Sequence, residues 1–542
     1  MKRPADIVPI VILLLGWVAG MFVDIMEVDA GQYASMSLEM LKSSDFLHLR
    51  DRGVDYLDKP PLIFWLTTLS FKAFGVGTFA YKLPSVLLAM LAVWSTGRLG
   101  AFLYDRRTGY YAALIQASCQ AMFLMNNDVK TDMYMIGPMA FALWQLVVFA
   151  RGGKWWHLQL GFVGLAIAML GKGPIGVVAP ALAMGADFVL RRDWKGLFRR
   201  PWLLGLPVFA LLLLPFCLGL HEQFGWKGVK FFLWTQSFGR ITGASEWQND
   251  ASPFFFVHTY AWSFLPWTLV LLPAIGRKIR DIFRRGFRLS ATEEGLSLGG
   301  FVLLFIALST SRFKLPHYIF VTYPFAALLC AAYLKSLIEQ SPRRWERTFF
   351  FGQNLLLVVL TGIVAGTLAV WAFPQVSLLL TLVFALGWAA VLFSYFRFPT
   401  AEYRLVVFLV VGFAWVNFFV NAGLYPQLLT FQSTGKAGQY IRENDIPADR
   451  LYAYDEGGRA LDFYGGGVAQ QVNHVEEFGT VFPKPAYLYT TEKGRTVFTN
   501  SPHRVTLLKT FPHFRVGNLK LKFINPATRP EKVSPRYLLR ID

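Results

Sequence analysis

The sequence predicts a polytopic α-helical membrane protein with about thirteen transmembrane helices, followed by a soluble α/β domain. The chain has 542 residues, of which 54% are hydrophobic and only 16% are charged, and its mean hydropathy is +0.41. Long uncharged runs recur through its first four-fifths, as in membrane-spanning chains. From about residue 425 the composition becomes that of a soluble protein. We therefore expect a membrane domain over residues 1–424 and a soluble domain over residues 425–542.

Thirteen apolar segments are long enough, or nearly long enough, to cross a bilayer. They are residues 7–23, 82–103, 110–126, 133–150, 157–171, 174–190, 203–219, 258–275, 295–310, 317–338, 350–373, 376–396 and 404–421. The first segment follows Lys2 and Arg3, as the apolar part of a signal peptide would. No small-residue cleavage site comes after it, so we expect it to be retained as the first span.

Basic residues gather in the connectors between the apolar segments, which predicts that these connectors are cytoplasmic. The basic connectors are residues 105–107, 191–200, 277–288, 343–347 and 397–404. Successive connectors must alternate between the two sides of the membrane. All basic connectors fall on the cytoplasmic side only if a further apolar run, residues 62–75, lies along the outer interface as a juxtamembrane helix instead of crossing. The segments then expected outside the cytoplasm are residues 24–81, 127–132, 172–173, 220–257, 311–316 and the tail from residue 422.

Composition also narrows the range of partners. The formal net charge of +19 could indicate nucleic-acid binding. However, the Lys and Arg residues occupy short connectors, a distribution typical of membrane topology, so we expect membrane lipids and not nucleic acid as partners. Cys119, Cys217 and Cys330 all lie in apolar runs. They therefore predict neither a disulfide framework nor a thiolate metal site.

The C-terminal part reads as a small α/β domain. A helix is expected over residues 433–444. Strands are expected near residues 450–454, 485–490, 503–511 and 518–524. Gly465, Gly466 and Gly467 lack the spacing of a phosphate-binding loop, so we expect a turn without a nucleotide role.

Three carboxylates follow the first apolar segment directly: Asp24, Glu27 and Asp29. One interpretation is structural, in which they solvate a helix end and Asp29 caps an amphipathic helix over residues 30–41. The other is catalytic, in which one carboxylate removes a proton from an acceptor hydroxyl. The sequence leaves both interpretations open.

Lysines and arginines in the outer turns are the second group of candidate residues. Lys59 precedes two prolines that stiffen the backbone, and it could bind either lipid headgroups or the phosphate of a lipid carrier. Lys172 lies between two glycines, and Arg312 and Lys314 share a short outer connector. Because cations are disfavoured in outer turns, a phosphate or pyrophosphate ligand is a natural compensation.

Further polar residues lie at the same predicted face. Asp128, Lys130 and Asp132 occupy one outer turn, where Lys130 is also placed to pair with an aspartate. The loop over residues 220–257 is rich in tryptophan, which favours interface anchoring over sugar stacking. Weak candidates for metal ligands are Asp58, Glu246, Asp250 and His258. No short fixed ligand spacing is present, so a divalent metal is compatible with the sequence but no cofactor is predicted as a requirement.

Four motifs in order resemble a known family. They are Asp29 with Tyr33-Ala34, then Tyr56-Leu-Asp-Lys-Pro-Pro-Leu62, then Leu170-Gly-Lys-Gly-Pro174, and finally Phe313-Lys-Leu-Pro-His-Tyr-Ile319. In this combination the chain resembles the bacterial ArnT-like branch of the GT-C glycosyltransferases, which is related to the protein O-mannosyltransferases. The resemblance covers nearly the whole chain and implies the GT-C fold with a periplasmic C-terminal α/β domain. The chain departs from the first motif at Ala30 and Gln32, where the family commonly has Glu and Arg.

The resemblance implies an inverting transfer of a sugar from a polyprenyl-phosphate (undecaprenyl) donor, at the periplasmic face of the bacterial inner membrane. The acceptor would be lipid A, another glycolipid or a protein. Asp29 would be the general base, and Tyr56 and Lys59 would contact the carrier phosphate. The other substrate-binding residues would be Tyr33, Asp132, Lys172, Arg240, Arg312, Lys314 and Tyr318.

A transporter or flippase of a lipid-linked glycan is the alternative from another class. The same cations would then bind the headgroup without chemistry. Transporters need polar groups near the bilayer midplane and usually show repeated halves. The sequence instead confines its unusual charges to one face and adds a large soluble tail, which favours the enzyme.

Overall fold

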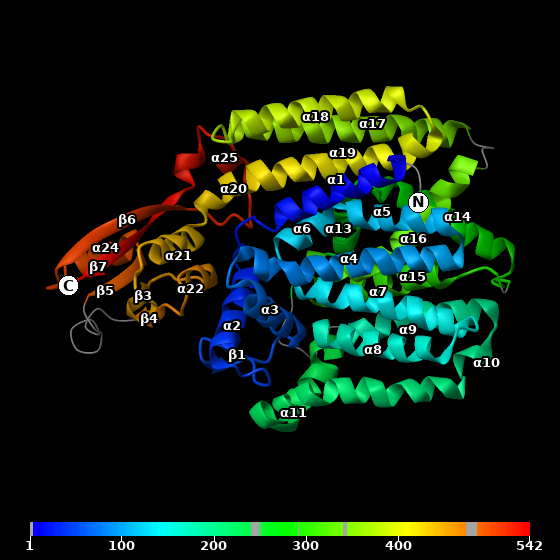
Figure 1. The fold of residues 1–542 in the computed structure, drawn as a ribbon, viewed down its shortest axis with the longest axis horizontal. Coiled ribbons are helices and arrows are strands. Elements are labelled where there is room, and N and C mark those ends of the chain that lie inside the picture. Colours follow the sequence, from blue (N-terminus) through cyan, green and yellow to red (C-terminus); the bar gives the residue numbers. More distant parts are fainter. Residues whose placement is uncertain (1–3, 240–248, 250, 291, 340–343, 473–484) are drawn as a thin grey trace.

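The chain folds into a bundle of long helices with a sheet domain at one end (Figure 1). In the computed structural model, the residues described are 4–239, 249, 251–290, 292–339, 344–472 and 485–542. The N-terminus lies at the end of the bundle opposite the sheet domain (Figure 1). We call the end that carries the sheet domain the domain end, and the opposite end the basic end.

Each of the thirteen predicted apolar segments lies on helical structure. The helices of the bundle are α1 (Pro4–Gly20), α4 (Thr78–Leu103), α5 (Arg106–Ser118), α6 (Gln120–Asn127), α7 (Thr131–Ala150), α8 (Trp155–Lys172), α9 (Ile175–Arg191), α10 (Trp194–Leu197), α11 (Leu206–Lys230), α13 (Phe255–Ser263), α14 (Thr268–Arg284), α15 (Leu296–Ser309), α16 (Tyr323–Glu339), α17 (Arg344–Thr367), α18 (Leu378–Arg397), α19 (Phe408–Phe419) and α20 (Tyr425–Leu428). By length and apolarity alone, 7 helical stretches of the described chain can span a membrane, or up to 8 if a bent pair counts as one span. The chain is thus a multi-pass membrane protein, and the number thirteen stays a prediction. Residues 258–275 do not form one straight helix, because α13 and α14 meet at 119°.

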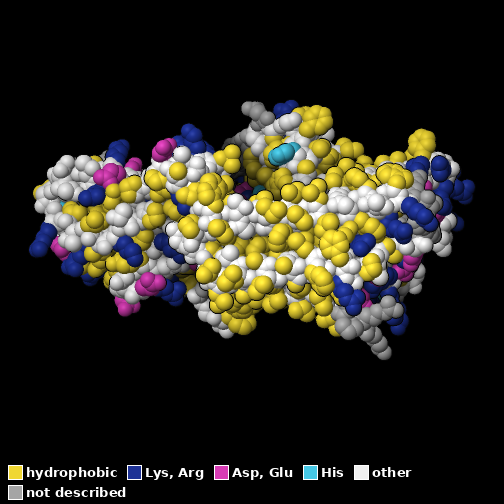
Figure 2. All heavy atoms as spheres, turned by 90° about the horizontal axis from the view of Figure 1, so that it is seen from above, with side chains coloured by type: hydrophobic (Ala, Val, Ile, Leu, Met, Phe, Trp, Pro, Cys, Tyr) yellow, Lys and Arg dark blue, Asp and Glu magenta, His cyan; other side chains and the backbone are white. Residues whose placement is uncertain are grey.

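Ion pairs bring two of the basic connectors together at one end of the bundle. Arg107 contacts Asp6, at 2.8 Å, and Glu402, so the connectors over residues 105–107 and 397–404 meet the start of α1 there. Figure 2 shows hydrophobic side chains covering the middle of the molecule, with Lys and Arg gathered toward its ends. This is the surface expected of a protein whose middle faces lipid. The side of the membrane that each end faces stays a prediction.

The first outer segment forms two helices and a short hairpin at the domain end. These elements are α2 (Asp29–Ser43), β1 (Arg50–Asp51), β2 (Val54–Asp55) and α3 (Leu62–Phe74). The amphipathic pattern predicted over residues 30–41 lies on α2, which buries Tyr33, Met36 and Met40 in a hydrophobic cluster shared with α3. The ambiguous run over residues 62–75 is α3, a helix too short to cross a bilayer unaided.

The soluble domain combines a five-stranded sheet with short helices. The sheet has the order β4–β3–β5–β7–β6, with β3 parallel to β4 and β5, and β7 antiparallel to β5 and β6. Its elements are α21 (Ser433–Glu443), β3 (Leu451–Tyr454), α22 (Arg459–Tyr464), β4 (Gln470–Val472), β5 (Ala486–Thr491), α24 (Glu492–Thr499), β6 (Val505–His513), α25 (Leu521–Ile524) and β7 (Ser534–Ile541).

The predicted helix and three of the four predicted strands of this domain are present. The strand predicted near residues 518–524 is wrong, because Leu521 to Ile524 form one helical turn. In that turn Phe523 is fully buried, whereas Leu521 is 85% exposed. The apolar residues in this stretch therefore do not form one buried face, as those of a strand would. Strands β4 and β7 were not predicted. Gly465 to Gly467 follow α22 without regular structure, as expected.

Two of the three clustered carboxylates hold the soluble domain against the bundle. Asp24 accepts hydrogen bonds from Lys436 at 2.8 Å and from Gln439 at 3.0 Å, both on α21. Glu27 accepts a hydrogen bond from the backbone N–H of Ala460 at 2.8 Å, in the first turn of α22. Burial raises the pKa of Glu27 above its ordinary value. The backbone approaches so closely here that a Cβ at Gly458 would lie 2.5 Å from Glu27 Oε1.

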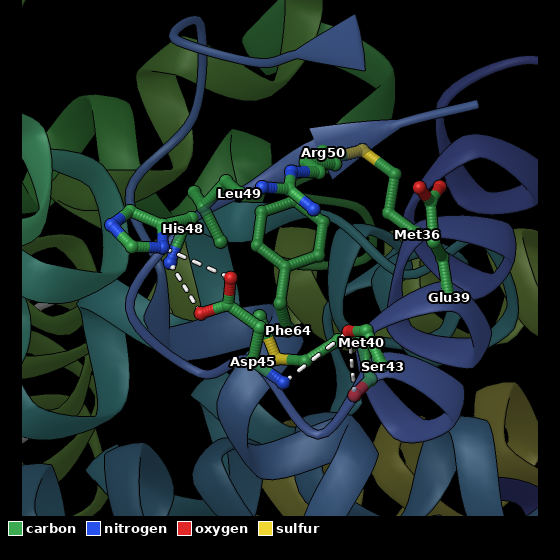
Figure 3. A pocket seen from close by; sticks show the side chains of 9 residues that line it. All are labelled: Met36, Glu39, Met40, Ser43, Asp45, His48, Leu49, Arg50 and Phe64. Atoms are coloured by element: carbon green, nitrogen blue, oxygen red, sulfur yellow. Dashed lines mark hydrogen bonds and ion pairs between the residues drawn. The ribbon is translucent and has the colours of Figure 1, made fainter. Parts of the chain in front are cut away.

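A histidine ties the outer loop to α11. His48 lies beside Asp45 at the edge of a small hollow under α2 (Figure 3). Its Nδ1 is 2.9 Å from Asp45 and its Nε2 is 3.0 Å from Glu222 on α11. The hydrogen bond with Asp45 raises the pKa of His48 above its ordinary value. The hollow has a volume of about 30 Å³, room for little more than one water, so it is no substrate site.

We expect His48→Gln to destabilise the protein in a pH-dependent way. Because the folded state raises the pKa of His48, the protonated ring stabilises the fold fully below its unfolded pKa of about 6.5. That stabilisation is lost as the pH rises through the higher folded value. The thermal midpoint of His48→Gln should therefore fall well below that of the wild type at pH 6 and approach it at pH 9.

The control for this prediction is His221→Gln, a change next to Glu222 that leaves the His48 contacts in place. A midpoint difference between wild type and His48→Gln that is the same at both pH values would contradict the prediction.

Candidate functional site

A cavity of about 430 Å³ opens at the domain end, where the outer loop meets the ends of several bundle helices. This volume is typical of a small-molecule site. Its charged and polar lining residues are Asp29, Gln32, Tyr33, Tyr56, Asp58, Lys59, Lys130, Thr131, Lys172, Gln236, Ser311, His317 and Tyr318. Its apolar wall consists of Met135, Ile175, Leu308, Phe313 and Leu315. One cavity thus combines two carboxylates, three lysines and an apolar side.

Asp29 is held at the cavity wall by a lysine from another loop. It is the first residue of α2, but the N-cap position is Val28 and no side chain caps this helix, so the capping interpretation of Asp29 is wrong. Its carboxylate instead accepts a hydrogen bond from Lys130 at 3.0 Å. Lys130 also contacts Asp128 at 3.1 Å. Burial disfavours the ammonium, yet the two carboxylates raise the pKa of Lys130 above its ordinary value, which keeps it charged.

A second lysine and a buried aspartate join α8 to α7. Lys172 is the last residue of α8, where the helix dipole favours a cation. It donates to Asp132 at 2.5 Å, and Asp132 is fully buried. The ammonium also lies 4.6 Å from the centre of the Tyr318 ring, a cation–π contact. His317 Nε2 is 3.9 Å from the other oxygen of Asp132, so the short helix over residues 316–322 closes this side of the cavity.

A third lysine approaches from the segment before α3. Lys59 donates to Asp58 at 2.5 Å. Two prolines follow it, and Pro61 is the N-cap residue of α3, so the helix fixes the position of the preceding loop. Gln236 donates to the backbone carbonyl of Asp58, which ties this loop to the segment after α11. Tyr56 completes this wall with its ring packed edge-on against Phe64.

The structure brings together seven of the predicted site residues, namely Asp29, Tyr33, Tyr56, Lys59, Asp132, Lys172 and Tyr318. Two other predicted residues do not line the cavity in the described part of the chain. Arg312 is exposed, and the ammonium of Lys314 donates to the carbonyl of Ala251 at 3.2 Å. The short connector turns these two side chains away because its apolar residues Phe313 and Leu315 face the cavity instead. Arg240 lies outside the described residues.

The weak metal candidates do not converge within the described residues. Asp58 lines the cavity, whereas His258 is exposed on α13. Glu246 and Asp250 lie outside the described residues. No group of three or more His, Cys, Asp or Glu side chains placed to hold a metal ion is found in the part of the chain that the structure describes.

Some lining residues were not predicted from the sequence. Gln32 lies three residues after Asp29 on α2, and this helical spacing was a usable signal for a shared face. Lys130 was expected to lie in an outer turn and to pair with an aspartate, but it was not predicted as a substrate-binding residue. Gln236 and His317 carried no signal beyond their place in outer segments, because the contacts that bring them to the cavity join distant parts of the chain.

Known proteins resemble this chain in sequence. A family model described as dolichyl-phosphate-mannose-protein mannosyltransferase matches residues 58–218. An undecaprenyl phosphate-α-4-amino-4-deoxy-L-arabinose arabinosyl transferase 2 from Sodalis glossinidius is 29% identical over 418 residues, which are 72% of each chain. The transferase of the corresponding name from Pseudomonas aeruginosa strain PAO1 is 27% identical over 68% of this chain and 67% of its own length.

Solved structures share the fold. The crystal structure of ArnT from Cupriavidus metallidurans bound to undecaprenyl phosphate superposes with a TM-score of 0.73 at 18% identity, over 98% of this chain and 97% of that one. The chain has the ArnT-like GT-C fold and resembles the ArnT-like glycosyltransferases in sequence. The oligosaccharyltransferase AglB from Archaeoglobus fulgidus is more distant, with a TM-score of 0.51 at 13% identity over 90% of this chain and 69% of its own length.

The ArnT-like fold explains why the site lies at the domain end. In this chain the outer segment, the α6–α7 turn and the end of α8 all meet there. The outer segment supplies Asp29, Asp58 and Lys59 to the cavity, and the other two supply Lys130 and Lys172. The likeness extends over the soluble domain as well as the bundle, because nearly the whole of both chains superposes. The fold predicted from the sequence motifs is therefore confirmed.

We expect Lys172→Met to destabilise the ArnT-like bundle by about 3 kcal/mol, because it leaves the buried carboxylate of Asp132 without its cation. Adding Asp132→Asn should restore much of this loss, since the double variant removes both charges. Thermal unfolding of detergent-solubilised protein measures both effects.

Lys154→Met is the matched control, since Lys154 is an exposed lysine at the opposite end of α8. It should change the midpoint little. A double variant that is as unstable as Lys172→Met alone would show that the charge pair is not the cause.

Proposed function

We propose that the protein transfers a sugar from a polyprenyl-phosphate carrier to a glycolipid acceptor such as lipid A, with inversion at the anomeric carbon. The observation that carries this proposal is the composition of the cavity, in which two carboxylates and three lysines share a space with an apolar wall. The names of the sequence relatives and the carrier bound to ArnT of Cupriavidus metallidurans support the donor class.

Asp29 supplies the base in this reaction. Its side chain is 42% exposed, so one oxygen can hold Lys130 while the carboxylate remains open to the cavity. Asp29 takes the proton of an acceptor hydroxyl, and the oxygen of that hydroxyl bonds to the anomeric carbon. The bond from that carbon to the carrier phosphate oxygen breaks at the same time, and the electron pair leaves with the phosphate. A single displacement of this kind inverts the anomeric carbon.

The lysines stabilise the leaving group. As the bond to the sugar breaks, the carrier phosphate gains one negative charge, so a cation near it stabilises the transition state more than the bound donor. Lys59 and Lys172 face the cavity from two different elements and are placed for this role. The apolar residues Leu308, Phe313 and Leu315 offer a surface for the first isoprene units of the carrier.

A glycolipid is the favoured acceptor because the chain matches ArnT over nearly its whole length, whereas the mannosyltransferase family model matches residues 58–218 only. A protein acceptor is the second candidate, and that family match is the observation favouring it. We place the reaction at the periplasmic face of the bacterial inner membrane, because the Lys- and Arg-rich connectors between the apolar segments are typical of a cytoplasmic side.

We expect Asp29→Asn to reduce turnover by about 10²- to 10⁴-fold, the range typical for loss of a general base. The assay uses purified protein, a polyprenyl-phosphate sugar and a lipid A acceptor, and measures free polyprenyl phosphate. Asp24→Asn is the matched control, because Asp24 belongs to the same acidic cluster but binds the soluble domain. It should retain most activity.

Full turnover by Asp29→Asn would refute its role as the base. Release of carrier phosphate without any acceptor would contradict transfer as the reaction. Movement of the intact donor across proteoliposome membranes without release of phosphate would support the transporter alternative.

We expect the reaction to proceed without an added divalent metal, because Lys59, Lys130 and Lys172 already supply positive charge in the cavity. Turnover after extensive treatment with EDTA should stay within about twofold of the untreated enzyme. A larger loss that Mg²⁺ or Mn²⁺ restores would show a metal requirement, and Asp58 would then be the first ligand to test.

A further inference from the structure

An arginine of the soluble domain reaches the wall of the cavity through one shared carboxylate. Asp51, at the end of β1, accepts a hydrogen bond from Arg459 Nη2 at 2.7 Å. The same oxygen of Asp51 accepts a hydrogen bond from Gln32 Nε2 at 2.8 Å. Gln32 lines the cavity next to Asp29. A chain of hydrogen bonds therefore runs from the soluble domain to Gln32, which lines the cavity beside the proposed catalytic base.

Arg459 is held rigidly at the start of α22. The backbone N–H of Ala460, the next residue, donates to Glu27, so the start of this helix is fixed to the outer loop. Helix α2 packs directly against it, because a Cβ at Gly31 would lie 3.3 Å from Arg459 Cβ and 3.2 Å from Ala460 N. A side chain larger than glycine at position 31 would push the two helices apart. The guanidinium is thus presented from a fixed backbone.

The contact with Asp51 sets the direction of the Gln32 amide. One N–H of the amide donates to Asp51, which fixes the orientation of the amide and leaves its carbonyl oxygen, together with the second N–H, available to a ligand. Asp29 and Gln32 lie three residues apart on α2, so the carbonyl and the proposed base share one helical face. Both groups accept hydrogen bonds. They fit a substrate group that donates, namely a hydroxyl or an amine.

The Arg459–Asp51 pair is not arranged as a fully satisfied structural ion pair. Asp51 is 12% exposed and Arg459 is 24% exposed, so both are largely removed from solvent. Within the described part of the chain, Asp51 Oδ1 and Arg459 Nη1 are buried atoms without a hydrogen-bond partner. Buried polar atoms are normally satisfied, and exceptions are often found where a group serves function over stability.

We propose that Arg459 is a positioning residue of the transferase site, which it serves by orienting Gln32 through Asp51. This inference rests on the proposed function. The carbonyl of Gln32 then receives a hydroxyl or amino group of the sugar or acceptor beside Asp29. The soluble domain is accordingly a part of the active site, and its docking sets the geometry of one cavity wall.

A second arginine at the same domain contact provides a matched control. Arg52 donates through Nη2 to Asp462 Oδ2 on α22 at 2.7 Å, and its side chain is 27% exposed, close to the value for Arg459. Its ion pair also joins the outer loop to the soluble domain. Its hydrogen bonds go to Asp462 and Glu39 and not to Asp51 or Gln32. Arg459 Nη1 also lies 3.9 Å from Asp462, so loss of Arg52 affects this shared carboxylate as well as domain docking. It leaves in place the hydrogen bonds that Arg459 and Gln32 donate to Asp51.

The test compares wild type, Arg459→Gln, Gln32→Ala, the double variant and Arg52→Gln in the transfer assay. We expect about tenfold lower kcat/KM for Arg459→Gln and for Gln32→Ala, the size of one lost hydrogen bond to the substrate. The double variant should be no worse than Gln32→Ala, because both changes remove the same contact. Arg52→Gln should stay within about twofold of wild type, and Arg459→Lys should recover part of the loss.

The inference would be overturned if the fold-losses in kcat/KM of the two single variants multiplied in the double variant. It would also be overturned if Arg52→Gln lost as much kcat/KM as Arg459→Gln. Full activity of Arg459→Gln alongside an active wild type would overturn it as well and leave the proposed function intact. An inactive wild type would contradict the proposed function instead. The coupling between Arg459 and Gln32 is then measured by thermal unfolding of the same variants, where additive changes would overturn the inference.

Discussion

The pairing of lysines with carboxylates at the domain end is the constraint on which the site depends. A charge removed from water is costly unless an opposite charge compensates it. Lys130 lies between Asp29 and Asp128, and Lys172 contacts the buried Asp132. Each pair joins two segments, so the outer loop, the α6–α7 turn and the end of α8 are drawn to one place. The charges that hold the cavity together are also those available to a phosphate and a hydroxyl.

The parts of this arrangement that follow from local pattern could be predicted from the sequence. Apolar length and helical periodicity located the bundle helices as well as α2 and α3. Charged residues stand out in an apolar chain, and for that reason Asp29, Lys59 and Lys172 were found. Where local pattern was ambiguous, prediction failed. Apolar and polar residues alternate near residues 518–524 as in a strand, but Leu521 to Ile524 form a helical turn. The single buried side chain of Phe523 accounts for the apolar position.

The remaining parts depend on contacts between distant segments, which one sequence does not reveal. The residue pattern alone did not separate Asp24 and Glu27 from Asp29, which the family resemblance favoured as the base. The structure shows that Asp24 and Glu27 have partners on α21 and α22. The link from Arg459 to Asp51 spans 408 residues. Lys314 appeared to face a ligand, but its partner is the carbonyl of Ala251. In each case the residue type was informative and the direction of the side chain was not.

Helix α2 carries both domain docking and the catalytic wall. Gly31 faces α22, where a Cβ would lie only 3.2 Å from Ala460 N, whereas Asp29 and Gln32 face the cavity. Residues on two faces of one rigid helix cannot move independently, so a shift of the soluble domain displaces the base. This connection between the soluble domain and the cavity wall gives a physical reason why three carboxylates lie close together between residues 24 and 29. Two of them fix the domain against the loop, and the third then occupies a position that their contacts determine.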